Sequence, residues 1–296
     1  MAELTEPANS PLPDLAVVVL SVGAPAELVA AVKSVIAQGQ PTELVVVNSG
    51  GGDARGLLVG EGIDVPVLER QERLFVGAAR NIGIANTTAR WIAFLAADCL
   101  AAPGWASERL RLHRDGAAMV ASAVMPDRPD SLVCWADHLL RFARRLPGLP
   151  AADALLYGVS FDRRVFERIG LFDGSLATGE DTELLARAAH FGKPVWAPTV
   201  VLVHRNARSV GGLLRDQAVR GRAYAVAMRR LRKLSPFKLL EEPVRQPRHA
   251  WRVAKRFLAG REREVALSSL WLVRIGCVAR ALGILSALLP IRPRTP

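Results

Sequence analysis

The sequence contains little cysteine and lacks the common nucleotide-binding motifs. Its 296 residues include only Cys99, Cys134 and Cys277, too few and too scattered for a disulfide framework or a zinc site. No strand is followed by G-x-G-x-x-G, and the P-loop pattern G-x-x-x-x-G-K-[ST] occurs nowhere. These absences argue against a disulfide-stapled domain, a dinucleotide dehydrogenase and a P-loop enzyme. An odd number of cysteines also fits a reducing compartment, so we expect a cytoplasmic protein.

Signals for secretion or membrane insertion are also weak. The first ten residues have neither the basic start nor the apolar stretch of a secretory signal. The run from Val265 to Leu289 is mostly apolar, but it includes Arg274 and Arg280. An arginine near the bilayer centre costs about 2.5–3.5 kcal/mol on insertion scales. We therefore expect this run to lie in a membrane interface or to pack on protein, and not to span a bilayer.

Acidic residues are scarce in the last third of the chain. The whole sequence has 39 basic and 28 acidic residues, a net charge of +11. The segment from Arg205 to Pro296 has 21 basic and 5 acidic residues, a net of +16, whereas residues 1–204 carry a net of −5. An acidic body with a basic extension predicts contact with an anionic membrane or a nucleic acid. Because the basic residues alternate with Leu, Val, Ala and Trp and not with exposed stacking aromatics or a known reader motif, nucleic acid is disfavoured.

The first half of the chain alternates short apolar runs with segments of helical period. Expected strands are residues 15–20, 43–47, 65–68 and 91–95, and expected helices are residues 26–38 and 76–87. Continuous apolar strands are buried on both faces, which predicts an α/β fold with a mostly parallel sheet flanked by helices. Such sheets bind ligands beyond the carboxyl ends of their strands. Ser21, Asn48 and the stretch Ala96–Asp98 are therefore candidate binding residues.

The second half is less regular and ends in helices. Expected strands cover residues 118–124, 155–161 and 195–203, and expected helices cover residues 131–145, 163–169 and 180–191. Beyond Arg208 the pattern is purely helical. Pro236, Pro243 and Pro247 are expected to separate three helices there, because proline interrupts helical hydrogen bonding.

Several polar residues have both a structural and a functional interpretation. Asp98 follows an apolar strand, where it can hold a divalent cation against phosphate oxygens or cap the next helix. Glu180 and Asp181 open a helix after Gly179; carboxylates there complement the helix dipole, and one could also act as a general base. His204 ends a strand, where it can bind a metal or a phosphate or serve the fold alone.

Two further features stay open on the residues alone. Arg80 lies in a helix after an exposed turn, where it can contact a diphosphate or face solvent. Gly50, Gly51 and Gly52 follow a strand and either allow a ligand to approach the backbone or form a flexible turn.

Taken in order, these segments resemble the family 2 glycosyltransferases of the GT-A fold. The resemblance runs from about Leu15 to Arg229. Its matching segments are Leu15–Gln38, Val45–Asp53, Gly77–Gly83, Phe94–Cys99 with Pro103–Trp105, Ile169–Asp173, Gly179–Asp181 with Arg187, and His204. Seven matches in the right order make the resemblance specific, although each one alone is weak.

The resemblance implies a role for each matching residue. Asp181 matches the catalytic base, with Glu180 beside it. Ser21, Ala97 and Arg80 fall in donor-binding segments, and Asn48 stands where the family usually has an aspartate that reads the nucleotide base. The family's Asp-x-Asp metal motif reads Ala96-Ala97-Asp98, so only the second acid is present. The resemblance implies Mg²⁺ or Mn²⁺ at Asp98, with His204 as a second ligand.

The implied activity is inverting transfer of a hexosyl group from a nucleotide-diphospho-sugar to the hydroxyl of a glycan or lipid-linked acceptor. We expect a flexible segment over residues 1–13 and a catalytic domain over 14–208, with nucleotide-binding and acceptor parts at about 14–116 and 117–208. Residues 209–296 form a basic helical extension, expected at the inner face of the cell membrane in cell-envelope synthesis, with Trp251 and Trp271 in contact. The alternatives are a non-catalytic GT-A-like protein that binds nucleotide sugars and a nucleic-acid-binding protein. The sequence predicts no oligomeric state.

Overall fold

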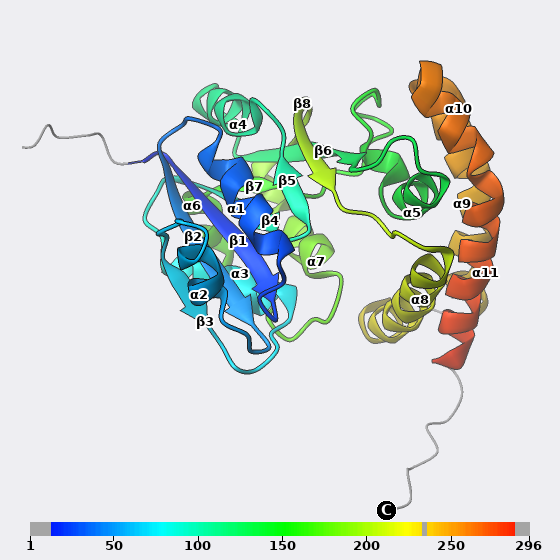
Figure 1. Ribbon diagram of the computed structural model, residues 1–296, viewed down its shortest axis with the longest axis horizontal. Coiled ribbons are helices and arrows are strands. Elements are labelled where there is room, and N and C mark those ends of the chain that lie inside the picture. Colours follow the sequence, from blue (N-terminus) through cyan, green and yellow to red (C-terminus); the bar gives the residue numbers. More distant parts are fainter. Residues whose placement is uncertain (1–12, 233–235, 288–296) are drawn as a thin grey trace, which may run out of the picture.

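The computed structural model describes residues 13–232 and 236–287, in which one sheet is covered by helices and flanked by a helical extension (Figure 1). The strands are β1 (Leu15–Val22), β2 (Thr42–Ser49), β3 (Val67–Glu69), β4 (Trp91–Ala96), β5 (Cys99–Ala101), β6 (Met119–Pro126), β7 (Ser160–Asp162) and β8 (Val195–His204). Their order is β3-β2-β1-β4-β7-β6-β8-β5. Strands β3, β2, β1 and β4 run parallel, as do β6 and β8, whereas β7 and β5 are antiparallel to their neighbours. The expected α/β class with a mostly parallel sheet is confirmed.

Helices lie on both faces of this sheet, and four more form the extension. The first group comprises α1 (Glu27–Ile36), α2 (Ala54–Val59), α3 (Val76–Ala85), α4 (Trp105–Arg114), α5 (Leu132–Phe142), the 3₁₀ turn η1 (Ala143–Arg145), α6 (Arg163–Ile169), α7 (Glu180–Arg187) and the 3₁₀ turn η2 (Ala188–Phe191). The second comprises α8 (Val210–Arg232), α9 (Pro236–Phe257), α10 (Gly260–Ser268) and α11 (Leu270–Ser286). The extension stands beside α5 (Figure 1).

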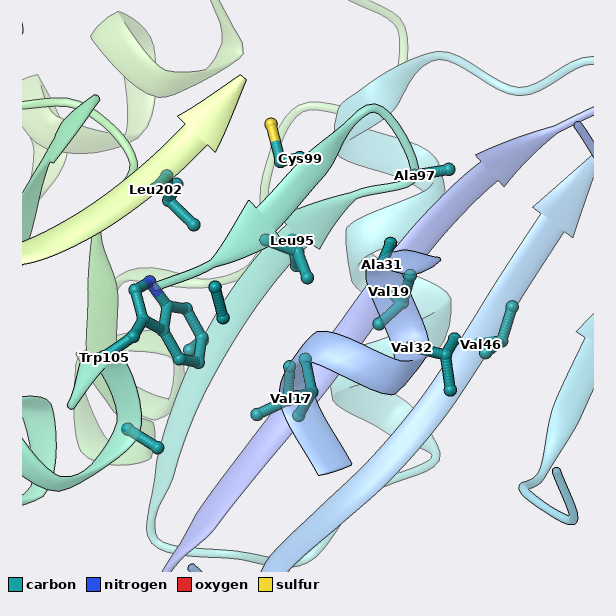
Figure 2. Packing of buried hydrophobic residues seen from close by; sticks show 14 of the residues in the cluster. Val17, Val19, Ala31, Val32, Val46, Leu95, Ala97, Cys99, Trp105 and Leu202 are labelled. Carbon is teal, nitrogen blue, oxygen red and sulfur yellow. The ribbon is translucent and has the colours of Figure 1, made fainter. Parts of the chain in front are cut away.

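The apolar runs form strands because both sides of the sheet are buried. Along β1, Val17 and Val19 belong to one hydrophobic cluster, whereas Ala16 and Val18 belong to another. Adjacent side chains point to opposite faces of a strand, so a continuous apolar run supplies two cores. Figure 2 shows Val17 and Val19 facing α1. Because helices cover both faces of the sheet, a ligand can reach it at the strand ends. The sequence predicts this binding edge at the carboxyl ends of β1 and β4.

The extension corrects one expectation from the sequence. Pro236 begins α9, where a missing N–H costs nothing, but Pro243 and Pro247 lie inside this helix and do not end it. Ala250 and Val253 of the same helix are fully or almost fully buried in a cluster shared with α5 and α11. Burial of this apolar side holds together a helix whose prolines would break it in isolation.

Smaller differences concern short elements. The strand expected over residues 155–161 is limited to β7, and the strand expected over residues 65–68 is displaced to β3. The sequence analysis did not predict β5 or α2. Strands of three residues carry too few side chains to show a period. Residues 1–12 of the expected flexible segment lie outside the described residues.

The apolar run from Val265 onward is divided between two helices. No single helix of the described chain is long and apolar enough to cross a membrane, but α10 and α11 together meet the length and composition needed, with a bend of 47° between them. One side of the run, including Ala266 and Val273, packs in the cluster with α5 and α9. Residues 288 and 289, which end the run, lie outside the described residues.

Candidate active site

A cavity of about 560 Å³ lies at the carboxyl ends of β1 and β4. Its lining includes five residues that the sequence analysis selected: Ser21, Arg80, Ala97, Asp98 and Asp181. Three come from the sheet edge, Arg80 from α3, and Asp181 from the first turn of α7. The fold thus gathers residues from both halves of the chain around one cavity, as expected for an open α/β sheet.

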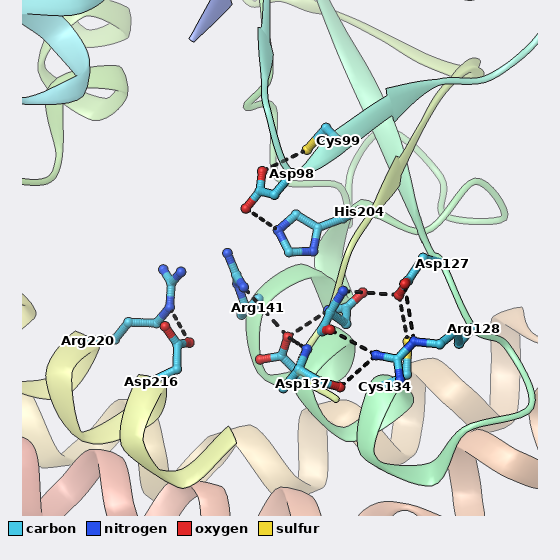
Figure 3. A network of polar contacts seen from close by, with 12 residues as sticks. Asp98, Cys99, Asp127, Arg128, Cys134, Asp137, Arg141, His204, Asp216 and Arg220 are labelled. Atoms are coloured by element: carbon cyan, nitrogen blue, oxygen red, sulfur yellow. Dashed lines mark hydrogen bonds and ion pairs between the residues drawn. The ribbon is translucent and has the colours of Figure 1, made fainter. Parts of the chain in front are cut away.

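Strand pairing places Asp98 beside His204. Because β5 pairs antiparallel with β8, Cys99 lies opposite His204, and Asp98 precedes Cys99 in the turn after β4. His204 Nε2 lies 3.4 Å from Asp98 Oδ2, and Cys99 Sγ lies 3.5 Å from Asp98 Oδ1 (Figure 3). Burial works to raise the pKa of Asp98, but the hydrogen bond and charge of His204, together with Arg141, lower it to about 2. Asp98 is therefore a carboxylate at neutral pH.

The end of β8 that carries His204 is anchored to α5. The buried Asp137 accepts hydrogen bonds from Asn206 Nδ2 at 2.8 Å and from the backbone N–H of Ala207 at 3.1 Å. His204 itself is buried against the ring of Phe142, with 4.8 Å between ring centres. Packing and hydrogen bonds therefore fix the imidazole before any ligand arrives.

The Asp98 and His204 pair fits a divalent cation. Their donor atoms and the Cys99 sulfur lie within 4.8 Å of one another. Half of the Asp98 side chain is exposed, so a cation can enter. A carboxylate suits Mn²⁺ and Mg²⁺, and an imidazole adds a ligand for Mn²⁺. Burial and the charge of Asp98 raise the pKa of the Cys99 thiol well above its usual value, so the protonated sulfur contributes little to binding a hard cation.

Arg80 forms an ion pair with the two acids at the start of α7. Its Nη1 lies 2.7 Å from Asp181 Oδ1 and 3.2 Å from Glu180 Oε1, and its guanidinium stacks over the rings of Phe94 and Phe172. Arg80 also lines the cavity, so the diphosphate contact expected from the sequence stays a prediction beside its ion pair with the candidate base. Burial and the neighbouring Asp181 raise the pKa of Glu180, although Arg80 opposes them. Glu180 thus takes up a proton more readily than an ordinary glutamate.

Asn48, expected from the sequence to contact the donor, does not line the cavity. It is fully buried and lies outside the lining of the cavity. Its Oδ1 accepts a hydrogen bond from the backbone N–H of Ala24, and its Nδ2 donates to the carbonyl of Gly51. Gly50, Gly51 and Gly52 all have φ between 77° and 80°, which favours glycine. Asn48 therefore ties together the two loops that follow β1 and β2.

The sequence analysis did not identify three arginines that line the cavity, Arg145, Arg205 and Arg208. Arg145 is almost completely buried and donates hydrogen bonds to the carbonyl of Ser122, the shorter at 3.0 Å. Burial lowers its pKa to about 10, so it remains a cation at neutral pH. Arg205 directly follows His204 in the sequence, and its position beside a candidate site residue could have identified it. Buried cations beside a carboxylate pair are suited to bind phosphate.

Comparison with known proteins agrees with this geometry. The family model described as "Glycosyl transferase family 2" matches residues 16–169. The succinoglycan biosynthesis protein ExoO of Rhizobium meliloti (strain 1021) is 30% identical over 210 residues, which cover 64% of this chain and 59% of that protein. The chain therefore spans less than two thirds of the length of this curated relative.

Solved structures extend the similarity of fold to nearly the whole chain. The mannosyltransferase PcManGT from Pyrobaculum calidifontis, in complex with GDP-Man and Mn²⁺, has a TM-score of 0.58 and 18% identity, covering 96% of this chain and 90% of that one. S. aureus TarS 1-349 in complex with UDP-GlcNAc has a TM-score of 0.52 and 11% identity, covering 92% and 90%. The family model itself covers more than half of the chain, so this protein belongs to glycosyl transferase family 2.

Proposed function

We propose that this chain is an inverting hexosyltransferase that moves a sugar from a nucleoside diphosphate to an acceptor hydroxyl in cell-envelope glycoconjugate synthesis. The observation that carries the proposal is one cavity lined by Asp181 and Asp98, with His204 beside Asp98, in a chain of this family. PcManGT and TarS are described with GDP-Man and UDP-GlcNAc, which supports a nucleotide-sugar donor. The name of ExoO supports a glycan acceptor.

Asp181 is the proposed base. It takes the proton of the acceptor hydroxyl while the oxygen forms a bond to the anomeric carbon and the bond from that carbon to the diphosphate breaks. Attack from the face opposite the leaving group inverts the anomeric configuration. Arg80, 2.7 Å from Asp181 Oδ1, holds this carboxylate in position.

The departing diphosphate gains negative charge, which the other side of the site can stabilise. Arg145 and Arg205 line the cavity and supply fixed cations for the phosphate oxygens. Asp98 and His204 would hold Mn²⁺ or Mg²⁺, and the bound cation would supply further positive charge for the leaving group. Ser21 and Ala97 complete the donor wall beside them.

The proposal includes a peripheral location at the cytoplasmic face of the cell membrane. On α11 the exposed apolar side chains recur at steps of four and three residues, which is one helix face: Trp271, Ile275, Val278, Leu282 and Leu285. Trp251 of α9 is also about half exposed. An apolar face with tryptophans and flanking arginines suits the interface of an anionic membrane.

A thermal-shift screen of nucleotide sugars with and without Mn²⁺ tests the donor and the cation together. We expect one nucleotide class to raise Tm by several degrees when Mn²⁺ is present, because a ligand that binds only the folded state stabilises it. Asp98→Ala should remove the Mn²⁺-dependent part of that shift, whereas Asp115→Asn, which changes an exposed carboxylate outside the cavity lining, should keep it. No shift with any nucleotide sugar would contradict the proposal.

Donor hydrolysis separates the enzyme from a non-catalytic binding protein. The enzyme should slowly release nucleoside diphosphate from the donor identified in the screen, since water can replace the acceptor. Binding without any hydrolysis or transfer would favour the non-catalytic alternative.

A further inference from the structure

A second and larger cavity, of about 1070 Å³, lies between the end of α5, η1 and the helices of the extension. We refer to it as the arginine cavity, because eight arginines line it against only two carboxylates, Asp153 and Glu242. Four of these arginines come from α9 and the others from α5, η1, α8 and α11. The four arginines Arg141, Arg220, Arg245 and Arg280 form ion pairs with carboxylates, and the other four have no acidic partner among the described residues. These four unpaired cations around one space favour a bound anion.

The α9 arginines form one face of the helix. Arg245, Arg248, Arg252 and Arg256 follow one another at steps of three, four and four residues. Like charges at these spacings lie next to each other and destabilise a helix. Within the described chain, Arg248 and Arg252 have no acidic partner, and Arg256 contacts only the ring of Phe257. Arg245 is paired with Glu241 at 3.1 Å, so three arginines of this row remain without an acidic partner in the described chain, and a bound anion would stabilise them.

The carboxylates of the cavity do not neutralise this row. Glu242 is engaged by Arg280 of α11. Arg144 donates a hydrogen bond to the backbone carbonyl of Asp153, at 3.2 Å, and not to its carboxylate. Burial, Arg144 and Arg252 all lower the pKa of His249, which lines the same space. Burial is the largest cause and Asp153 opposes the shift, but the part that comes from Arg144 and Arg252 reflects positive charge beside the cavity.

The turn η1 separates the arginine cavity from the donor cavity. Arg144 lines the arginine cavity, whereas the next residue, Arg145, lines the donor cavity and feels the charge of Asp181. Arg141 also lines the arginine cavity, and Figure 3 shows its guanidinium between Arg220 and Asp98. The arginine cavity and the donor cavity are therefore lined by adjacent residues of the same turn.

The arginine cavity also adjoins the apolar surface of the extension. Leu140, Leu149, Val253 and Phe257 contribute apolar side chains to its lining. Arg248 and Arg252 also line a neighbouring depression of about 590 Å³ that includes Trp251 and Leu270. The cavity thus leads from the active site toward the helices that expose apolar side chains. Its occupant should combine a compact anion with an apolar chain.

We propose that the arginine cavity binds the diphosphate of a lipid-linked acceptor. Arginine pairs with phosphate oxygens through two parallel hydrogen bonds, so Arg248 and Arg252 can each hold one phosphate group. The lipid chain leaves along Trp251 toward the membrane, and the acceptor sugar extends past η1 to Asp181. This inference rests on the proposed transferase function, for which it names the acceptor class.

The test measures binding of farnesyl diphosphate, a soluble lipid diphosphate, to the full chain by calorimetry. We expect binding to the unaltered protein, much weaker binding of inorganic diphosphate, and none of farnesol. Arg248→Gln combined with Arg252→Gln should weaken binding about a hundredfold, since each charge-assisted contact contributes about tenfold. The matched control, Arg261→Gln combined with Arg263→Gln, removes the same charge from exposed α10 and should bind normally.

Three results would overturn the proposal. They are unchanged affinity in the Arg248 and Arg252 double variant, equal affinity for inorganic diphosphate, and full displacement by dihexanoyl phosphatidylglycerol, which would indicate a general anion or membrane headgroup site. The thermal shift with nucleotide sugars should be the same in the double variant as in the unaltered chain. Farnesyl diphosphate binding needs no turnover, so the acceptor site and the transferase function can fail independently. Circular dichroism melting shows whether the double variant folds.

Discussion

The two cavities of this protein differ in how their charges are balanced. In the donor cavity, Arg80 is paired with Glu180 and Asp181, and His204 with Asp98. In the arginine cavity only half of the eight arginines are paired with a carboxylate of the described chain, and Arg144, Arg248, Arg252 and Arg256 are not. Paired charges hold catalytic groups in place before a substrate arrives, whereas unpaired charges need the substrate to balance them. The net charge of +11 is therefore the sum of two different segments, an acidic body of −5 and a basic extension of +16.

The largest expected effect comes from removing the base in the balanced cavity. Asp181→Asn should lower kcat by about 10²–10⁴-fold, the usual contribution of general base catalysis, while donor affinity measured by calorimetry changes little. Asp115→Asn serves as the control, because that carboxylate is exposed and outside the cavity lining. Unchanged turnover in Asp181→Asn would remove Asp181 from the reaction.

Removing the positive charge of Arg80 from the same cavity should change the pH dependence of kcat. Arg80 lowers the pKa of Glu180, so Arg80→Gln should raise the pKa of Glu180 further. Because Glu180 lies beside the proposed base, activity on the acidic side should then be lost at a higher pH. Measured kcat from pH 5 to 8 gives the shift. Arg80→Lys keeps the charge and should shift less; identical profiles for Arg80→Gln and the unaltered enzyme would show that the ion pair does not control the base.

Replacing exposed apolar side chains of the extension should weaken membrane binding and leave the donor cavity unchanged. Val278→Ser combined with Leu282→Ser removes two exposed apolar side chains of α11 and should weaken binding to phosphatidylglycerol vesicles by roughly tenfold or more. The control is Val219→Ser on α8, which is 62% exposed, similar to Leu282 at 61%. Equal vesicle binding by all three proteins, measured by sedimentation, would place the contact elsewhere.

The smallest expected effect concerns the stability of the sheet body. His113 is buried, with Nδ1 2.7 Å from the Ala117 carbonyl and Nε2 2.8 Å from Ser160 Oγ. Burial lowers its pKa to about 4 from the usual 6.5. The folded state therefore binds fewer protons than the unfolded state between these values, and stability falls as pH falls from about 6.5 to about 4, by up to about 1.4 kcal/mol per unit. Urea unfolding of His113→Asn should show a shallower slope, whereas exposed His190→Asn should not.

Much of the fold and part of the site could be predicted from single stretches of sequence. The run LAVVVL identified β1 because a strand buried on both faces must be apolar throughout. Asp98 was found because it follows such a strand. Arg145 was missed, since nothing in the residues around it shows that η1 faces a cavity. Asn48 was expected in the cavity, yet its side chain forms hydrogen bonds to the backbone of two loops.

The sequence by itself determined the strand and helix periods, the motif positions and the uneven distribution of charge. These are local properties, set by neighbouring side chains within one element. Only the tertiary structure decided that Arg80 meets Asp181, 101 residues later in the chain, and that Pro243 and Pro247 lie within α9. It also decided that arginines from α5, η1, α8, α9 and α11 surround one space. Such contacts depend on how elements pack together, and packing energy is shared among residues that the order of the chain does not bring together.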